Sequence, residues 1–432
     1  MFGIYEWGLG YAYINDLYYK KYLVEIIMGL FSSHTNLLFV YPIAIFIMAG
    51  IVSYFSIPVV ITIAKSKNLV DVPDQDRKRH QKIIPTLGGI AIYASIVISL
   101  SLFSEVHAVK SLTFLSGALA ILFFIGLKDD ILVISPLKKL LGQLSAVFLV
   151  VISGLHISDL GGVFGVNNIS LWVGVPLTFF AFIVIINAYN LIDGIDGLAG
   201  LIGVVASSAF GMFFLLNKEY ALALLSFSLV GALTGFLIHN FSPATIFMGD
   251  TGSMIVGFLL AYQTIKFVEL NVTHSVHSYL SHAAPILVVA ILIVPLYDTL
   301  RVFIIRAIDG RSPFDAGFEH IHHQFLEMGL SHRGIALTLA ALNVGFIALI
   351  LLFPKANVNL LLAGLIATTL IVFPTKGMKR WIIFKLFHKK YEKVKLYKNI
   401  QQLEVDFQHD DQSIDKTQRK NKAHKEAYEN VG

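Results

Sequence analysis

Long apolar runs alternate with short polar segments along most of the chain. Many windows of about 20 residues contain no charged side chain, which is typical of helices that cross a bilayer. Backbone groups in lipid must be hydrogen-bonded within their own segment, so each run predicts a helix. We therefore predict an all-α, polytopic integral membrane protein with about 11 transmembrane helices. These helices are predicted near residues 37–64, 87–104, 110–127, 138–154, 170–187, 198–216, 220–238, 251–269, 283–305, 334–353 and 356–374.

The pattern divides the chain into three parts. Residues 1–34 form an N-terminal extension that is rich in tyrosine and lacks the apolar core of a cleaved signal peptide. This extension is either an interfacial aromatic segment or a product of start-site choice, since Met28 offers a later start. Residues 35–374 form the transmembrane domain. Residues 375–432 form a basic, polar tail that we expect to be partly disordered.

Lysine and arginine placement predicts the orientation, because cytoplasmic loops carry an excess of both. The loops near residues 65–82 and 128–139 and the segment after residue 300 are rich in Lys and Arg. The opposite loops hold only Lys110, Lys218, Lys266 and Lys355. The C-terminus is therefore predicted to be cytoplasmic, and eleven spans place the N-terminus outside.

Composition supports the membrane assignment and excludes some functions. Of the 432 residues, 56% are hydrophobic and 14% are charged, whereas an average soluble protein carries about 25% charged residues. The net charge of +5 lies in the tail, so a basic surface for nucleic acid is not expected. The chain has no cysteine, which excludes a disulfide framework and a thiolate metal site.

Five polar clusters stand at the ends of the predicted helices, and the predicted topology puts all five on the cytoplasmic face. Acidic side chains near lipid are costly and usually functional. Each cluster taken alone also has a structural interpretation, such as a solvated helix end or a polar seam between helices. The clusters are Leu69–His80, Gly126–Asp130, Asn187–Leu198, Phe247–Ser253 and Glu319–Phe325.

The acidic residues suit a general base or a site for a hard cation. Asp129 and Asp130 are adjacent, and like charges in a restricted space raise one pKa. Asp250 precedes a predicted helix, where it is either an N-cap or part of a phosphate site. Mg²⁺ prefers a few carboxylates together with substrate phosphates. A three-residue spacing predicts one polar helical face formed by Asn187, Asn190, Asp193 and Asp196.

Cationic and imidazole side chains offer contacts to phosphate. His320, His322 and His323 lie within four residues, and we favour phosphate contact over a zinc site for them. Arg77 lies in a loop that is either an anion-binding loop or a positive-inside signal. Lys139 is either an anchor at a span edge or a phosphate partner.

Asp298 lies inside the ninth predicted span. We interpret it as structural, paired with Arg301 one turn away.

Taken in order, the clusters resemble the polyprenyl-phosphate N-acetylhexosamine-1-phosphate transferase family over residues 38–352 or thereabouts. Asp129 and Asp130 match its Asp-Asp motif, and a Lys-x-x-x-Gln motif follows at Lys139 and Gln143. The other matching positions are Asn187, Asn190, Asp193 and Asp196, then Phe247, Gly249, Asp250, Gly252 and Ser253, and finally the His-x-His-His loop of His320, His322 and His323.

This resemblance implies transfer of N-acetylhexosamine 1-phosphate, most simply GlcNAc 1-phosphate, from a UDP-N-acetylhexosamine to undecaprenyl phosphate, with UMP leaving. It implies Mg²⁺ dependence, with Mn²⁺ as a substitute, and an active site on the cytoplasmic side of the cell inner (plasma) membrane. The implied catalytic residues are Asp129, Asp130, Asp250, His322 and His323, and the implied metal ligands are Asp250, Asp193 and Asp130. The implied substrate-binding residues are Lys139, Asn187, Asn190, Asp193, Gly194, Ile195, Asp196, Phe247, His320 and Arg77. By the same resemblance, Gly194, Ile195, Asp196 and Phe247 would line the pocket for the uridine of the donor.

One departure concerns the segment before the histidines. The family often has Pro-Asp-Arg there, whereas this chain has Ala316, Gly317 and Phe318, which leaves the sugar specificity open. The His-Ile-His-His loop favours the branch that uses UDP-GlcNAc or related sugars over the phospho-MurNAc-pentapeptide transferase of peptidoglycan synthesis. A secondary transporter and an inactive scaffold are further alternatives. The downstream glycan pathway and a homodimer are left open.

Overall fold

The computed structural model describes residues 37–67, 69, 84–103, 110–273, 283–312 and 320–373. These residues are helical apart from their connections and an isolated bridge at Ile84, and no β-strand occurs among them, which confirms the all-α prediction for this part of the chain. The predictions for residues 1–34, for Arg77 and for the tail 375–432 fall outside the described residues.

Among the described residues, each predicted apolar run is helical over most of its length. The helices are α2 (Leu37–Ser66), α3 (Gly88–Leu102), α4 (Lys110–Leu132), α5 (Pro136–Ile152), α6 (Leu171–Leu191), α7 (Leu198–Leu216), α8 (Tyr220–Asn240), α9 (Gly249–Thr273), α10 (Ala284–Ile291), α11 (Ile293–Ile308), α12 (Ile321–Glu327), α13 (His332–Leu351) and α14 (Val358–Val372). A short 3₁₀ turn, η2 (Val163–Gly165), lies between α5 and α6.

Six of the described helices are long and apolar enough to cross a membrane. They are α2 from Val40 onward, α6, α7, α8, α9 as far as Asn271, and α13; α10 and α11 make up to seven if the pair is counted as one span. The protein is therefore a multi-pass membrane protein. The count of about 11 spans and the orientation of the termini stay predictions.

The ninth predicted span, 283–305, is not one continuous helix. It breaks at Leu292 into α10 and α11, which are bent by 76°. Pro295 explains the break, because proline has no N–H to donate to the carbonyl four residues earlier and its ring crowds that carbonyl. That carbonyl belongs to Ile291, and it accepts a hydrogen bond from Asn343 Nδ2 at 3.0 Å; Ala290 O accepts from the same nitrogen at 3.1 Å. Buried Asn343 of α13 thus satisfies the backbone at the break.

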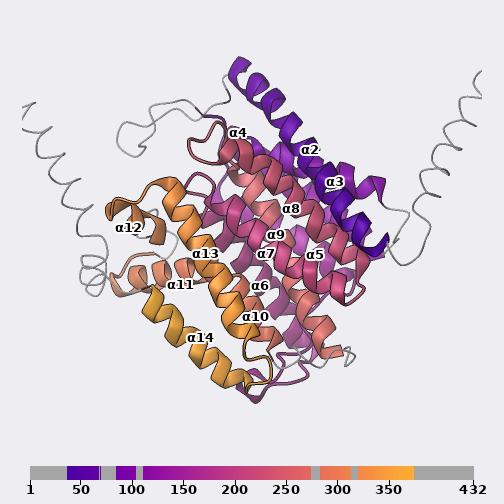
Figure 1. Ribbon diagram of the computed structural model, residues 1–432, viewed down its shortest axis with the longest axis vertical. Helices are drawn as coiled ribbons and strands as arrows, with labels where there is room; N and C mark the ends of the chain where they lie inside the picture. Colours follow the sequence, from indigo (N-terminus) through magenta and orange to yellow (C-terminus); the bar gives the residue numbers. More distant parts are fainter. Residues whose placement is uncertain are drawn as a thin grey trace, which may run out of the picture. The chain divides into compact units, whose positions relative to one another are not determined.

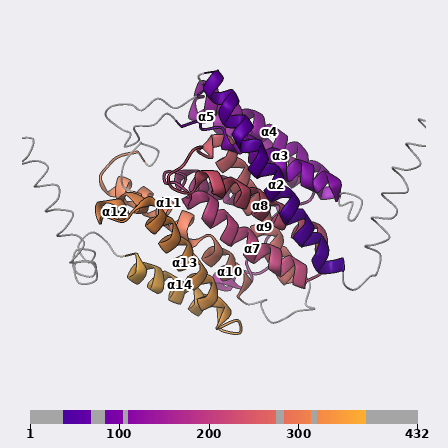
Figure 2. The same cartoon turned by 45° about the horizontal axis from the view of Figure 1, so that its top comes forward.

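Helix α9 lies in the interior of the bundle, with α2 along its periphery (Figures 1 and 2). Residues 251–263 are all buried, and α9 packs against α3, α4, α6 and α7. The N-terminal end of α9, which carries Asp250, consequently meets the ends of the helices that carry the other acidic clusters.

The chain divides into two compact units. One contains residues 1–320 and 332–365, and the other contains 321–331 and 366–432. Helix α12, which carries His322 and His323, belongs to the second unit and is described by itself.

Candidate active site

The α4–α5 hairpin brings two clusters of the sequence together. The chain reverses over three residues: Val133 has a positive φ of 46°, and Pro136 begins α5. Pro suits a first helical position because its missing N–H has no partner there. Asp129 stabilises the reversal by accepting a hydrogen bond from Ile134 N at 2.8 Å. As a result, Lys139 Nζ lies 3.2 Å from Asp129 Oδ2.

Asp130 caps the N-terminus of α9. Its Oδ1 accepts from Asp250 N at 2.7 Å, and its Oδ2 accepts from the backbone N of Thr251 at 3.0 Å and from the Thr251 hydroxyl at 2.5 Å. The first N–H groups of a helix have no partner within the helix, and they carry partial positive charge. A carboxylate from α4 therefore fastens α4 to the start of α9 and fixes the direction of Asp250.

Asp250 is held by two side chains from other helices. Lys139 of α5 forms an ion pair and hydrogen bond with Asp250 Oδ1. Asn190 Nδ2 of α6 donates to the same oxygen at 2.6 Å and lies 2.7 Å from Ser253 Oγ. The Lys139 ammonium thus bridges Asp129 and Asp250, two acids that belong to different clusters of the sequence.

Asn187 lies one turn before Asn190 on α6 and ties α6 to α5. Its Nδ2 lies 3.1 Å from Gln143 Oε1 and 2.8 Å from Ile183 O. Buried Gln143 also approaches Met254 Sδ of α9 at 3.6 Å. Asn187 and Gln143 therefore form a polar contact that joins α5, α6 and α9 next to the acidic cluster.

The spacing predicted that Asp193 and Asp196 would continue the helical face of Asn187 and Asn190. This prediction is wrong. Helix α6 ends at Leu191, and both acids lie in the turn that leads to α7. Asp side chains favour turns because they hydrogen-bond to nearby backbone groups, and Gly favours turns because it readily adopts a positive φ. Gly197 has a φ of 79°, and its N–H donates to Asn240 Oδ1 at 2.9 Å. In the same turn Gly194 is exposed and Ile195 is buried.

The Asp193 carboxylate faces the same helix N-terminus as Asp130. The backbone N–H of Gly249 lies close enough to favour its charged form. Burial, followed by the negative charges of Asp250 and Asp130, raises the pKa of Asp193 well above the ordinary value. The residue nevertheless keeps some exposed surface. Several carboxylates thus share a small volume in which bound positive charge is favoured.

Phe247 is fixed by its backbone. Its N–H donates to Pro85 O at 2.8 Å, and its carbonyl accepts from Gly88 N at 2.9 Å. Gly249 follows with a φ of 73°, and a Cβ there would lie 2.0 Å from Thr86 O. The segment before α9 therefore lies directly against the start of α3.

Asp298 has a partner that the sequence did not indicate. His320 Nδ1 lies 2.8 Å from Asp298 Oδ2, while the predicted pairing of Asp298 with Arg301 stays a prediction. Asp298 is fully buried and His320 is nearly so. An acidic residue inside an apolar helix was the only signal in the sequence for such a contact. On α12 the rings of His322 and His323 lie with centroids 4.4 Å apart; their phosphate contacts stay predictions.

The side chains suit a hard cation in part. Aspartate oxygens are the ligands that Mg²⁺ prefers. Among the described residues, however, no three His, Asp or Glu side chains are arranged to hold one ion. Mg²⁺ usually takes one or two carboxylates plus substrate phosphates, so the donors present fit that mode of binding and not an all-protein cage.

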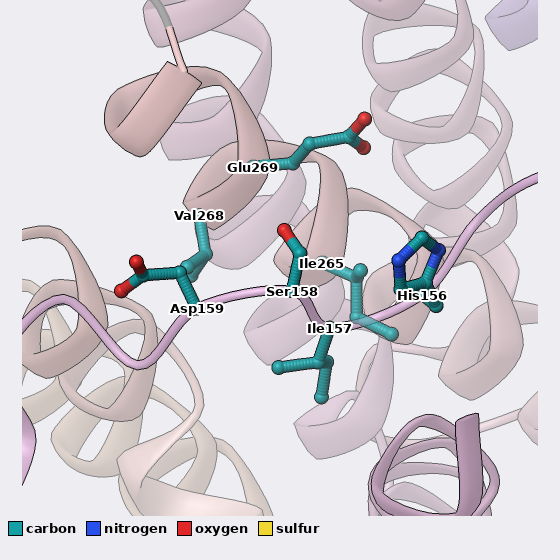
Figure 3. A pocket seen from close by; sticks show the side chains of 7 residues that line it. All are labelled: His156, Ile157, Ser158, Asp159, Ile265, Val268 and Glu269. Atoms are coloured by element: carbon teal, nitrogen blue, oxygen red, sulfur yellow. The ribbon is translucent and has the colours of Figure 1, made fainter. Parts of the chain in front are cut away.

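A pocket at the opposite end of α5 and α9 does not involve the acidic cluster. It is a hollow open to solvent, with about 220 Å³ of space that includes the solvent at its mouth. Figure 3 shows the α5–α6 connection on one side and the last turns of α9 on the other. Its lining residues are His156, Ile157, Ser158, Asp159, Ile265, Val268 and Glu269.

Comparisons with known proteins point to one family. Residues 112–268 match glycosyl transferase family 4. The chain is 32% identical over 333 residues to the Bacillus subtilis probable undecaprenyl-phosphate N-acetylglucosaminyl 1-phosphate transferase, covering 76% of this chain and 89% of the relative. It is 34% identical over 349 residues to the Mycobacterium leprae decaprenyl-phosphate N-acetylglucosaminephosphotransferase, covering 74% and 86%. It is 32% identical over 307 residues to the Salmonella typhi undecaprenyl-phosphate alpha-N-acetylglucosaminyl 1-phosphate transferase, covering 69% and 80%.

Proposed function

This chain belongs to glycosyl transferase family 4, and on that premise we propose that it transfers GlcNAc 1-phosphate from UDP-GlcNAc to undecaprenyl phosphate. The observation that carries the proposal is the junction of Asp129, Lys139, Asn190 and Asp250 at the N-terminus of α9. A phospho-MurNAc-pentapeptide transferase is not favoured, because these relatives are named for GlcNAc 1-phosphate transfer.

The reaction is a phosphoryl transfer. An oxygen of the lipid phosphate attacks the β-phosphorus of the UDP-sugar, the bond from that phosphorus to the bridging oxygen breaks, and UMP leaves. Such a reaction needs positioning and neutralisation of charge more than covalent chemistry. Lys139 lies between Asp129 and Asp250, so a small movement of its ammonium would offer donors to a phosphate oxygen. Asp129 would orient the lipid phosphate or accept its proton.

We propose Mg²⁺ as the cofactor, with Mn²⁺ as a substitute. Asp250 and Asp193 would hold the ion, and Asp130, the third implied ligand, fixes the start of α9 by accepting from Asp250 N and Thr251 N. When bound, such an ion neutralises charge on the diphosphate. The proposed location is the cell inner membrane, with the acidic cluster facing the cytoplasm, where UDP-sugars are made.

UMP release tests the function. Purified protein in detergent would receive UDP-GlcNAc, undecaprenyl phosphate and Mg²⁺, and each component would be omitted in turn. We expect release only when all three are present, and loss of release in Asp250→Asn. The matched control is His156→Ala, at the opposite end of α5, which should retain activity. Release without the lipid acceptor, or equal turnover in Asp250→Asn, would contradict the proposal. A panel of UDP-N-acetyl sugars would then establish the donor.

A further inference from the structure

The first turn of α13 contacts two segments that come from elsewhere in the chain. His332 Nδ1 lies 3.2 Å from Asp196 Oδ1 in the α6–α7 turn. Its neighbour Arg333 donates from Nε to the carbonyl oxygen of Ser242, and its guanidinium lies 5.7 Å from the ring centre of Phe241. The pair therefore contacts two connections that are far apart in sequence, the α6–α7 turn and the segment between α8 and α9.

Those two segments are also tied to each other. Asp196 Oδ2 accepts a hydrogen bond from Ala244 N at 3.1 Å, and the Asp196 side chain is almost fully buried. Asn240 accepts from Gly197 N at 2.9 Å and donates to Ile246 O at 2.9 Å. Contacts within the protein thus fix the orientation of the Asp196 side chain. The contact with His332 of α13 is one of them.

The position of this arrangement bears on the donor. The α6–α7 turn contains Gly194, Ile195 and Asp196, and the segment held by Arg333 leads within a few residues to Phe247. Sequence resemblance assigns all four to the nucleotide pocket. Gly194 is exposed while Ile195 and Asp196 are buried. The turn is therefore anchored in the protein by its buried side chains and accessible at Gly194. Displacement of a segment that lines the pocket weakens donor binding, even when no residue in contact with the substrate is removed.

We propose that His332 and Arg333 are positioning residues for the nucleotide half of the donor, acting through Asp196 and the 241–246 segment. The proposal rests on the proposed function and adds two residues to it. His332 contacts the Asp196 carboxylate, and Arg333 holds the 241–246 segment, which leads directly to Phe247. Both residues act before the transfer step, so they affect the donor and not the lipid acceptor.

Steady-state kinetics separates this role from a general structural one. In His332→Ala and in Arg333→Ala, we expect KM for UDP-GlcNAc to rise about tenfold, because each variant removes one polar contact that holds a segment of the nucleotide pocket in place. The kcat value and KM for undecaprenyl phosphate should stay within about twofold of wild type, because a role in positioning the donor does not alter the acceptor side. The control His156→Ala should change none of the three.

Conservative variants sharpen the test. His332→Gln keeps a donor that can reach Asp196, so it should recover most of the donor affinity. Arg333→Lys should recover less, because an ammonium lacks the planar group that stacks on Phe241. Arg333 is exposed, so its variants are expected to fold even if His332→Ala does not.

The outcomes distinguish the two proposals. If wild-type protein releases no UMP from UDP-GlcNAc, the proposed function fails. If wild type is active but the Arg333 and His332 variants keep a normal donor KM, the positioning role is wrong. A fall in kcat alone, or an equal rise in both KM values, would also overturn it, because either result indicates loss of folded enzyme or a general distortion.

Discussion

At the scale of single residues, the central observation is the position of the Lys139 ammonium. It lies within ion-pair distance of two acids from separate helices and is only partly exposed, at 18%. Charged groups that are partly buried depend on their partners, and removing one partner leaves the other uncompensated. Lys139 therefore does more than anchor the edge of a span, which was one of its two interpretations from the sequence.

We predict that Lys139→Gln lowers kcat by about 100-fold, the typical effect of removing one preorganised donor for developing charge. UMP release under saturating substrates measures this loss. Lys138→Gln is the matched control, because Lys138 is adjacent and exposed, and it should behave like wild type. Equal activity in the two variants would show that the ammonium has no part in the reaction.

At the scale of elements, the site depends on how closely α4 approaches α9. A Cβ at Gly126 would lie 2.4 Å from Thr251 Cα, so only glycine permits this approach. The contact places Asp130 within reach of the first N–H groups of α9. Sequence analysis identified Gly126 as part of a polar cluster without showing that its role is steric.

We predict that Gly126→Ala separates α4 from α9, destabilises the protein by about 1–3 kcal/mol and lowers activity. Gly117→Ala, on the same helix, is the control. A Cβ there would lie 3.4 Å from Leu149 Cδ1, which can adjust, and alanine favours the helix by about 1 kcal/mol. Thermal unfolding in detergent, measured beside UMP release, compares the two. If the two variants have similar unfolding temperatures and similar rates of UMP release, the steric role of Gly126 is wrong.

At the scale of the whole molecule, the orientation in the bilayer decides which substrates reach the acidic cluster. Ser135 and Ser170 flank α5 and its following connection, and both are exposed. Helix α5 has 17 residues, so its ends are about 25 Å apart at 1.5 Å per residue. The chain has no cysteine, so each position can carry a single introduced thiol.

We predict that a membrane-impermeant maleimide labels Ser170→Cys in intact spheroplasts, and labels Ser135→Cys only after permeabilisation. The reason is that Ser135 belongs to the lysine-rich connection that should face the cytoplasm. The labelled fraction of each variant is read by gel shift. The reverse pattern would place the acidic cluster outside the cell and contradict the proposed use of a cytoplasmic donor.

The sequence by itself determined the helices and the residue types at their ends. Apolar runs specify spanning helices because lipid leaves the backbone no other way to pair. The Asp-, Asn- and Gly-rich ends mark turns through chemistry that acts over a few residues, and their order identified the family. One prediction from spacing was wrong. Asp193 and Asp196 lie in the turn after Leu191 and not on a helical face.

Only the tertiary structure decided which side chains meet. Asp130 is 120 positions from the N–H of Asp250, and Lys139 is 111 positions from the Asp250 carboxylate. Asp298 contacts His320, and Asp196 contacts His332. Many acids and cations along the chain satisfy the same local rules, so the pairing depends on helix packing, on glycines at close approaches and on the bend at Leu292, none of which is encoded by spacing alone.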